Sequence, residues 1–189
     1  MALRVAVGSL STAEPYAATN FCSVADDIRR LFRFRNTPGE AGERLLNEVR
    51  RSMAVSVHIR RGDYVSDPHT NRFHGTCSVD YYNAAFDVIA SEVKEARFFV
   101  FSDDPQWARE NIKPPSEAVF VGRNTTQPDY EDMRLMLNCR HHIIANSSFS
   151  WWPAWLNSSS DKVVVAPRRW VADPKQAVLD VLPETWVSI

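Results

Sequence analysis

Two arginines and a glycine directly follow an apolar segment, in the run His58-Ile59-Arg60-Arg61-Gly62-Asp63-Tyr64. Arginine presents a planar fork of N–H groups that matches phosphate oxygens, and glycine lets the backbone come close to a ligand. The same run is compatible with a surface loop in which arginine and aspartate form ion pairs. Its Arg61-Gly62-Asp63 triplet also occurs in adhesion motifs, but three residues carry little specificity. On this chemistry, a phosphate site and a surface loop stay equally open.

Small hydroxyl residues follow a second apolar segment, in the run Asn146-Ser147-Ser148-Phe149. A helix that begins here would present backbone N–H groups to an anion. An ordinary serine N-cap explains the same residues and is the simpler interpretation of the motif by itself. The tryptophans that follow, Trp151, Trp152 and Trp155, are expected to pack in the core.

Three aspartates near predicted helix starts could have structural or functional roles. Asp104 precedes Pro105, a typical helix start, so Asp104 is expected to cap that helix. Its neighbour Asp103 is expected to face a binding cleft. Asp132 lies in the first turn of a predicted helix, where the helix dipole favours a carboxylate. Its functional alternative is to accept hydrogen bonds from a bound heterocyclic base such as guanine.

The elements that position these motifs alternate regularly from Ala54 onward. Short β-branched and apolar runs predict strands, and capping residues before a periodic apolar face predict helices. The segment Asp63–Cys77, which contains Pro68 and Gly75, is expected to be a loop. The predicted strands are Ala54–Ile59, Phe98–Phe101, Ala118–Val121, His142–Ala145 and Lys162–Ala166. The predicted helices are 78–96, the segment that starts at Asp104, Tyr130–Arg140 and 147–157.

This alternation predicts an α/β fold, a Rossmann-like parallel sheet with helices on both faces. Ligands of such sheets bind at the carboxyl ends of the strands, and the polar motifs fall at those ends. The helical side chains expected to face the core are Tyr82, Ala85, Phe86, Ile89, Met133, Met136 and Leu137. His141 and His142 are adjacent in a predicted strand and point to opposite faces, which argues against a shared metal.

Two regions are expected along the chain. Residues 1–50 would form an N-terminal remnant or appendage, and residues 51–189 the Rossmann-like domain. The first region has one short apolar run, Leu3–Val7, and a predicted helix from about Glu40 to Arg51. That content is too small for a second full domain.

The composition excludes several classes of protein. The chain has 189 residues, 22 Lys and Arg against 23 Asp and Glu, and is 44% hydrophobic. Near-neutral charge disfavours a nucleic-acid-binding protein or a protein that binds membrane surfaces through basic residues. No apolar run reaches eighteen residues, so no membrane span is predicted, and the start is too short and weakly patterned for a signal peptide. The chain is expected in the cytoplasm, in solution or peripheral to a membrane.

The cysteines and the glycosylation triplets fit that expectation. Cys22, Cys77 and Cys139 are far apart and odd in number, which disfavours a disulfide framework or a zinc site. Asn-x-Ser/Thr triplets start at Asn124, Asn146 and Asn157. Such triplets arise often by chance, and they are expected to be unused.

Together, the motifs resemble the α-1,2-fucosyltransferase family, of the glycosyltransferase family 11 type, whose members carry a His-x-Arg-Arg-Gly-Asp-Tyr signature. The similarity runs from about Val55 to Trp170, and several ordered motifs in one chain make it specific. The matching segments beyond the signature are Phe73-His74-Gly75 with Cys77 and Tyr81-Tyr82, then Phe101–Asp104, Glu131–Met136 and Ile143–Trp155.

The resemblance implies a GT-B fold, of which this chain is the C-terminal, donor-binding half. It implies inverting, metal-independent transfer of L-fucose from GDP-fucose to the 2-hydroxyl of a galactoside, with no further cofactor. By similarity, His58 and Asp132 contact guanine, and Arg60 binds the β-phosphate and stabilises the leaving GDP. The amides and hydroxyls of Ser147, Ser148 and Phe149 hold the same phosphates.

The remaining site residues are assigned less directly by the resemblance. Asp103 and Arg61 are expected in the donor site. Arg61 and Asp63 are expected either to support the residues that contact the donor or to lie on the acceptor side. Asp63 is a catalytic candidate, and the general base is left open among Asp63, Asp67 and His69.

The chain departs from the family pattern at two places. Residues 1–50 lack the Gly-Gly-Leu-Gly-Asn-Gln-type segment, so the chain is expected to be truncated at its N-terminus. The alternative to an active enzyme is therefore a non-catalytic GDP-sugar-binding module, and an adhesion module is a third hypothesis. Pro153 stands where relatives have glycine, and it is expected to lie in a first helical turn.

Overall fold

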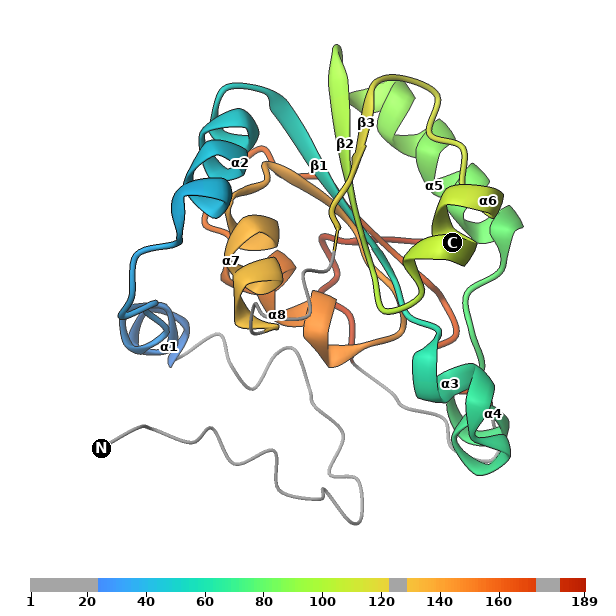
Figure 1. Ribbon diagram of the computed structural model, residues 1–189. Helices are drawn as coiled ribbons and strands as arrows, with labels where there is room; N and C mark the ends of the chain where they lie inside the picture. The colour runs from blue at the N-terminus through green and yellow to red at the C-terminus, as the bar shows by residue number, and fades with distance from the viewer. Residues whose placement is uncertain (1–23, 123–128, 173–180) are drawn as a thin grey trace.

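A computed structural model describes residues 24–122, 129–172 and 181–189. One six-stranded sheet forms the centre, in the order β3-β2-β1-β4-β5-β6, and every neighbouring pair is parallel (Figure 1). This order is the Rossmann one, with its switch point between β1 and β4. The predicted Rossmann-like α/β fold is thereby confirmed. The strands are β1 Met53–Ile59, β2 Ala96–Ser102, β3 Ala118–Phe120, β4 His141–Ile143, β5 Val164–Ala166 and β6 Val187–Ser188.

Helices cover both faces of the sheet, as expected. Alternate residues of β1 point to opposite sides, so Val55 and Val57 pack against α5 and α6, while Ala54 packs against α2 and α7. In Figure 1 these two groups of helices flank the sheet, with α8 beside α7. The helices are α1 Ala25–Leu31, α2 Glu40–Arg50, α3 Gly62–Ser66, α4 Pro68–His74, α5 Val79–Glu92, α6 Pro105–Asn111, α7 Tyr130–Asn138 and α8 Ser148–Leu156.

The predicted helix faces are largely correct. All four α5 side chains expected in the core are buried. In α7, Met136 is buried as expected, but Leu135 and Arg134 are buried in place of Met133 and Leu137, which are half-buried.

The helix α5 ends at Glu92, earlier than predicted. Ala96 already pairs with Met53 in the sheet, so the chain must turn before it. Glu95, with a φ of 57°, makes part of that turn.

The expectation of a loop over Asp63–Cys77 is wrong, because the chain forms α3 and α4 there. Asp67 is the N-cap of α4, and its carboxylate accepts hydrogen bonds from the His69 N–H at 3.0 Å and the Thr70 hydroxyl at 2.6 Å. Pro68 occupies the first helical position. This Asp-Pro pair is the same start signal as Asp104-Pro105, and it outweighs the turn residues around it.

The N-terminal region contributes to the sheet's covering layer. In α2, Leu46 and Val49 are buried in one cluster with Ala54 and Phe99. The short helix α1, which was not predicted, places Arg29 over the Trp155 ring at 5.0 Å. The domain boundary at residue 50 stays a prediction, and the run Leu3–Val7 lies outside the described residues.

Other expectations from composition can be compared with the described residues. Cys77 and Cys139 are free thiols, and Cys22 lies outside those residues. Asn146 and Asn157 are buried with their amides hydrogen-bonded, so neither triplet is accessible in the fold, while Asn124 is not described. Among the described helices, none combines the length and the hydrophobicity needed to cross a bilayer.

Candidate functional site

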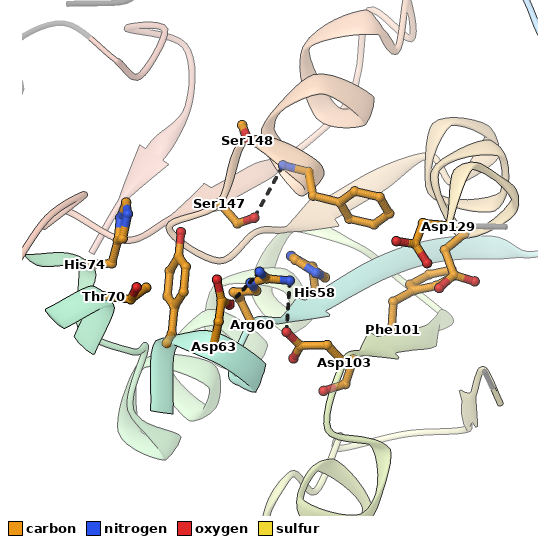
Figure 2. A pocket seen from close by; sticks show the side chains of 14 residues that line it. His58, Arg60, Asp63, Thr70, His74, Phe101, Asp103, Asp129, Ser147 and Ser148 are labelled. Atoms are coloured by element: carbon orange, nitrogen blue, oxygen red, sulfur yellow. Dashed lines mark hydrogen bonds and ion pairs between the residues drawn. The ribbon is translucent and has the colours of Figure 1, made fainter. Parts of the chain in front are cut away.

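A cavity of about 510 Å³ opens where β1, β2 and β4 end, at the switch point of the sheet. Figure 2 shows Arg60 near its centre, with Ser147 and Ser148 on one side and Asp103 on the other. All predicted site residues except Arg61 line this cavity. They are His58, Arg60, Asp63, Asp103, Asp132, Ser147, Ser148 and Phe149. Motifs separated by many residues along the chain thus meet at one place, while the role of each residue stays a prediction.

Arg60 is held between two carboxylates. One guanidinium nitrogen, Nη2, lies 2.6 Å from Asp63 Oδ1, and the other, Nη1, lies 2.9 Å from Asp103 Oδ2 (Figure 2). The guanidinium also lies over the ring of Tyr64, 5.1 Å from its centre. The arginine head is therefore fixed at the cavity surface with its charge already compensated.

Asp103 organises the turn that follows β1. Its Oδ1 accepts a hydrogen bond from the Arg61 backbone N–H at 2.8 Å, and its side chain is only 10% exposed. A Cβ atom on Gly62 would lie 2.7 Å from Asp103 Oδ2, so glycine permits this close approach. The expectation that Asp103 faces the cleft is met, and Asp104 caps α6 by accepting from the Trp107 N–H at 3.2 Å.

The structure does not bring the Arg61 side chain to the cavity. Its Nε donates to Asp104 Oδ2 at 3.2 Å, and its guanidinium lies 3.8 Å from the centre of the Trp107 ring. Arg61 thus ties the first motif to the start of α6. Consecutive residues point in different directions here, so the two arginines have separate surroundings.

Two short helices supply lining residues that the sequence analysis missed. The Tyr64 ring stacks on the His74 ring with centres 4.5 Å apart and planes 10° apart. Burial raises the pKa of Tyr64 and lowers the pKa of His74, so both side chains are uncharged near neutral pH. The full set of unpredicted lining residues is Tyr64, Thr70, His74, Phe101, Ser102 and Asp129. Most of them stood inside or beside quoted motifs, but Thr70 had no sequence signal.

The start of α8 faces the cavity as a potential anion site. Ser147 is the N-cap, since its Oγ accepts from the Phe149 N–H at 3.3 Å. The helix is anchored at its other end by Lys162, whose Nζ donates to the Ala154 and Asn157 carbonyls at 2.7 and 2.6 Å. First-turn N–H groups and the helix dipole then favour an anion at the cavity end of α8.

Pro153 does not lie in the first turn of α8, contrary to expectation. It is the sixth residue of that helix. Proline has no N–H, so it cannot donate to the carbonyl of Phe149 one turn earlier. The helix nevertheless continues to Leu156, with Trp151 held by a 2.9 Å hydrogen bond from its Nε1 to the Val181 carbonyl.

One end of the cavity suits a flat ring. The rings of His58 and Phe149 lie with centres 5.4 Å apart, and His58 is buried. Asp129 and Asp132, from the start of α7, line the same cavity. In Figure 2, Asp129 lies on the side opposite Thr70 and His74. Aromatic faces beside carboxylates can hold a heterocycle that donates N–H hydrogen bonds.

Charge is unevenly distributed in the cavity. Among the described lining residues, Arg60 is the only lysine or arginine, against the four carboxylates Asp63, Asp103, Asp129 and Asp132. Within the described ranges, no three His, Cys, Asp or Glu side chains gather in a way that could hold a metal ion. The positive features of the site are therefore Arg60 and the helix start at Ser148.

Comparison with known proteins gives a consistent family assignment. The profile described as Glycosyl transferase family 11 matches residues 19–189. The chain is 40% identical over 135 residues to the O-antigen biosynthesis glycosyltransferase WbnK of Escherichia coli. It is 38% identical over 173 residues to an alpha-1,2-colitosyltransferase of Escherichia coli, and 31% identical over 161 residues to galactoside alpha-(1,2)-fucosyltransferase 1 of Rattus norvegicus.

These similarities cover most of this chain but about half of each relative. The matches span 71%, 89% and 80% of this chain, and 44%, 58% and 42% of the three relatives in the same order.

Proposed function

The chain belongs to glycosyl transferase family 11, and on this premise we propose that it binds GDP-fucose and transfers L-fucose to the 2-hydroxyl of a galactoside with inversion. The observation that carries the proposal is that Arg60, the start of α8 and the two rings of His58 and Phe149 line one cavity. The names of two relatives specify α-1,2 transfer, one of colitose and one of fucose to a galactoside. The parallel sheet is of the Rossmann-like type from which GT-B glycosyltransferases are built.

In this proposal the donor lies across the cavity. Guanine occupies the end formed by His58 and Phe149, where Asp132 accepts hydrogen bonds from the ring N–H and the exocyclic amine. The diphosphate lies against Arg60 and the first-turn N–H groups of α8. The sugar then points toward Asp63, Thr70 and His74, on the other side of the cavity.

Cleavage of the bond between fucose and phosphate leaves negative charge on GDP. Arg60 and the α8 dipole are fixed before the reaction, so they can stabilise that charge without reorganisation. We propose that no metal and no further cofactor is needed, because these groups occupy the place where the charge develops.

A base must remove the proton of the acceptor hydroxyl, and we propose Asp63. The acceptor oxygen bonds to the sugar carbon as the phosphate oxygen leaves with the electron pair, and the proton goes to the Asp63 carboxylate. Asp63 lines the cavity and is half exposed, so an acceptor can reach it. Asp67 instead caps α4, where the Thr70 hydroxyl lowers its pKa, and His69 does not line the cavity.

A second candidate function is donor binding without transfer. It is favoured by the length of the match, since the chain spans about half of the curated relatives it matches. In that case GDP-fucose binds in the same cavity, and no product forms with galactosides.

Calorimetric titration of the 189-residue chain with GDP, GDP-fucose and ADP tests the donor assignment. We expect GDP and GDP-fucose to bind more tightly than ADP. A following assay for fucosylated lactose separates the two functions, since product supports transfer and binding without product supports the second function. An absence of binding by GDP and GDP-fucose would contradict both.

A further inference from the structure

The two carboxylates on Arg60 differ in how firmly they are held. Asp103 is 10% exposed, and it also accepts from the Arg61 backbone N–H at 2.8 Å. Its position against Gly62 leaves no room for a side chain there. Asp63 is 52% exposed, at the surface of the short helix α3. The Asp103 pair is thus built into the turn after β1, whereas the Asp63 pair is accessible to water.

A bound diphosphate must compete with these carboxylates for Arg60. Both terminal nitrogens of the guanidinium already lie within ion-pair distance of a carboxylate oxygen. A phosphate oxygen that approaches the Nη2 side meets the negative charge of Asp63 at the position it would take. Exposed ion pairs are weak and exchange readily. The ion pair with Asp103 is costly to break, because it would leave the shielded Asp103 Oδ2, which has no hydrogen-bond partner among the described residues, without its counter-charge.

We propose that Asp63 is a displaceable counter-ion of Arg60, which a phosphate of the ligand replaces, while Asp103 is a positioning residue that keeps Arg60 aimed at the cavity. This inference rests on the proposed donor site and adds a binding order to it. Phosphate binding releases the Asp63 carboxylate beside the sugar, where it can then accept the acceptor's proton. Donor binding therefore precedes the formation of a competent base.

The proposal gives the two aspartates opposite effects on affinity. In Asp63→Asn, the competing charge disappears and the exposed side chain can turn away, so GDP and inorganic pyrophosphate should bind roughly two- to fivefold more tightly. In Asp103→Asn, the new amide nitrogen faces the guanidinium and cannot accept from it, so both ligands should bind about tenfold more weakly.

Guanosine and a remote carboxylate serve as controls in the same titrations. Guanosine carries no phosphate, so Asp63→Asn should leave its affinity unchanged. Asp87→Asn removes an exposed carboxylate of α5 that does not line the cavity. This variant should bind GDP, pyrophosphate and guanosine with the affinities of the wild type. Thermal unfolding of each variant shows whether Asp103→Asn folds. If that variant does not fold, the titrations of Asp63→Asn still test the proposal.

A double-mutant cycle with Arg60→Ala separates displacement from a general charge effect. If Asp63 acts by occupying Arg60, the tighter binding in Asp63→Asn should vanish in the Arg60→Ala background. Persistence of the full gain there would overturn the proposal, as would equal or weaker GDP binding in Asp63→Asn alone. Failure of the wild type to bind GDP and pyrophosphate would instead remove the donor site itself.

Discussion

At the scale of single residues, Arg60 and Arg61 are neighbours in the chain but meet different parts of the molecule. Arg60 lines the cavity, and Arg61 lies on Trp107 and pairs with Asp104. Replacing Arg60 by alanine should therefore change ligand affinity, whereas replacing Arg61 by alanine should change stability.

We predict that Arg60→Ala and Arg60→Lys weaken GDP binding far more than Arg61→Ala. Loss of a charge-assisted hydrogen bond costs about 1.5–3 kcal/mol, or roughly 10- to 150-fold in Kd. Lysine cannot reproduce the forked contact. Calorimetric GDP titrations of the three variants measure this, and wild-type affinity in Arg60→Ala would contradict the phosphate assignment.

A second residue-scale prediction concerns base selection by Asp132. Asp132→Asn replaces one acceptor by a donor, so the preference for GDP over ADP should fall. Asparagine and aspartate are both tolerated in a helix start, so the first turn of α7 should survive. The measurement is the ratio of the two dissociation constants, together with the melting temperature. A lower melting temperature with an unchanged ratio would assign Asp132 a structural role only.

The residues of the site were predictable to the extent that they lie in contiguous motifs. His58 lies at the end of β1, Arg60 and Asp63 follow it, and parallel strands bring their carboxyl ends together. Thr70 reaches the cavity only through α4, a helix whose cap signal was misread as a loop. The direction of Arg61 depends on the partners Asp104 and Trp107, which no local pattern of the first motif contains.

At the scale of elements, His142 joins strands β1 and β4 to the end of α8. Asn157 Nδ2 lies 2.8 Å from His142 Nε2, and the Ser56 hydroxyl lies 2.8 Å from Nδ1. Because the amide nitrogen donates to Nε2, the imidazole carries its proton on Nδ1 and donates to Ser56. The same amide donates to the Cys139 carbonyl at 2.8 Å, which also ties the end of α8 to the end of α7.

We predict that this buried imidazole makes the protein sensitive to acid. Burial lowers the pKa of His142 from 6.5 to about 3 in the folded state. Between these values the unfolded chain binds the proton that the folded chain excludes, so stability falls as pH decreases from about 6.5 toward 3. One such group contributes a slope of about 1.4 kcal/mol per pH unit, as an upper value.

Urea unfolding as a function of pH measures that slope. In His142→Gln the free energy of unfolding should be lower at pH 7 but should depend less on pH below 6.5. Identical pH profiles in the variant and the wild type would show that other groups cause the acid sensitivity.

At the scale of the whole molecule, the cavity lies at the carboxyl ends of the central strands β1, β2 and β4. The strand order 3-2-1-4-5-6 could not be predicted from the sequence, because periodicity identifies strands but not their neighbours. The strand β6 was missed for a related reason, since its two residues carry no pattern and are defined by pairing with β5. The alternation of strand and helix was sufficient to predict a parallel sheet with helices on both faces.

We predict that the 189-residue chain binds GDP and transfers fucose only slowly. The proposed donor contacts all come from described residues at the carboxyl ends of the strands and from the helices beside them, whereas an acceptor must be oriented with respect to these residues for rapid transfer. The matched relatives are about twice as long as the part they share with this chain. GDP release with and without lactose, measured beside GDP binding, tests this, and rapid lactose-dependent turnover would contradict it.

The burial of two asparagines has a practical consequence for making the protein. The Asn146 amide donates to the His74 and Trp170 carbonyls, and the Asn157 amide to the Cys139 carbonyl. Both asparagines start triplets that oligosaccharyltransferase accepts, and this enzyme modifies chains in the secretory pathway before they finish folding. A glycan on either nitrogen would fill space that the core needs. Recombinant expression should therefore use a bacterial cytosol rather than a secreting eukaryotic host.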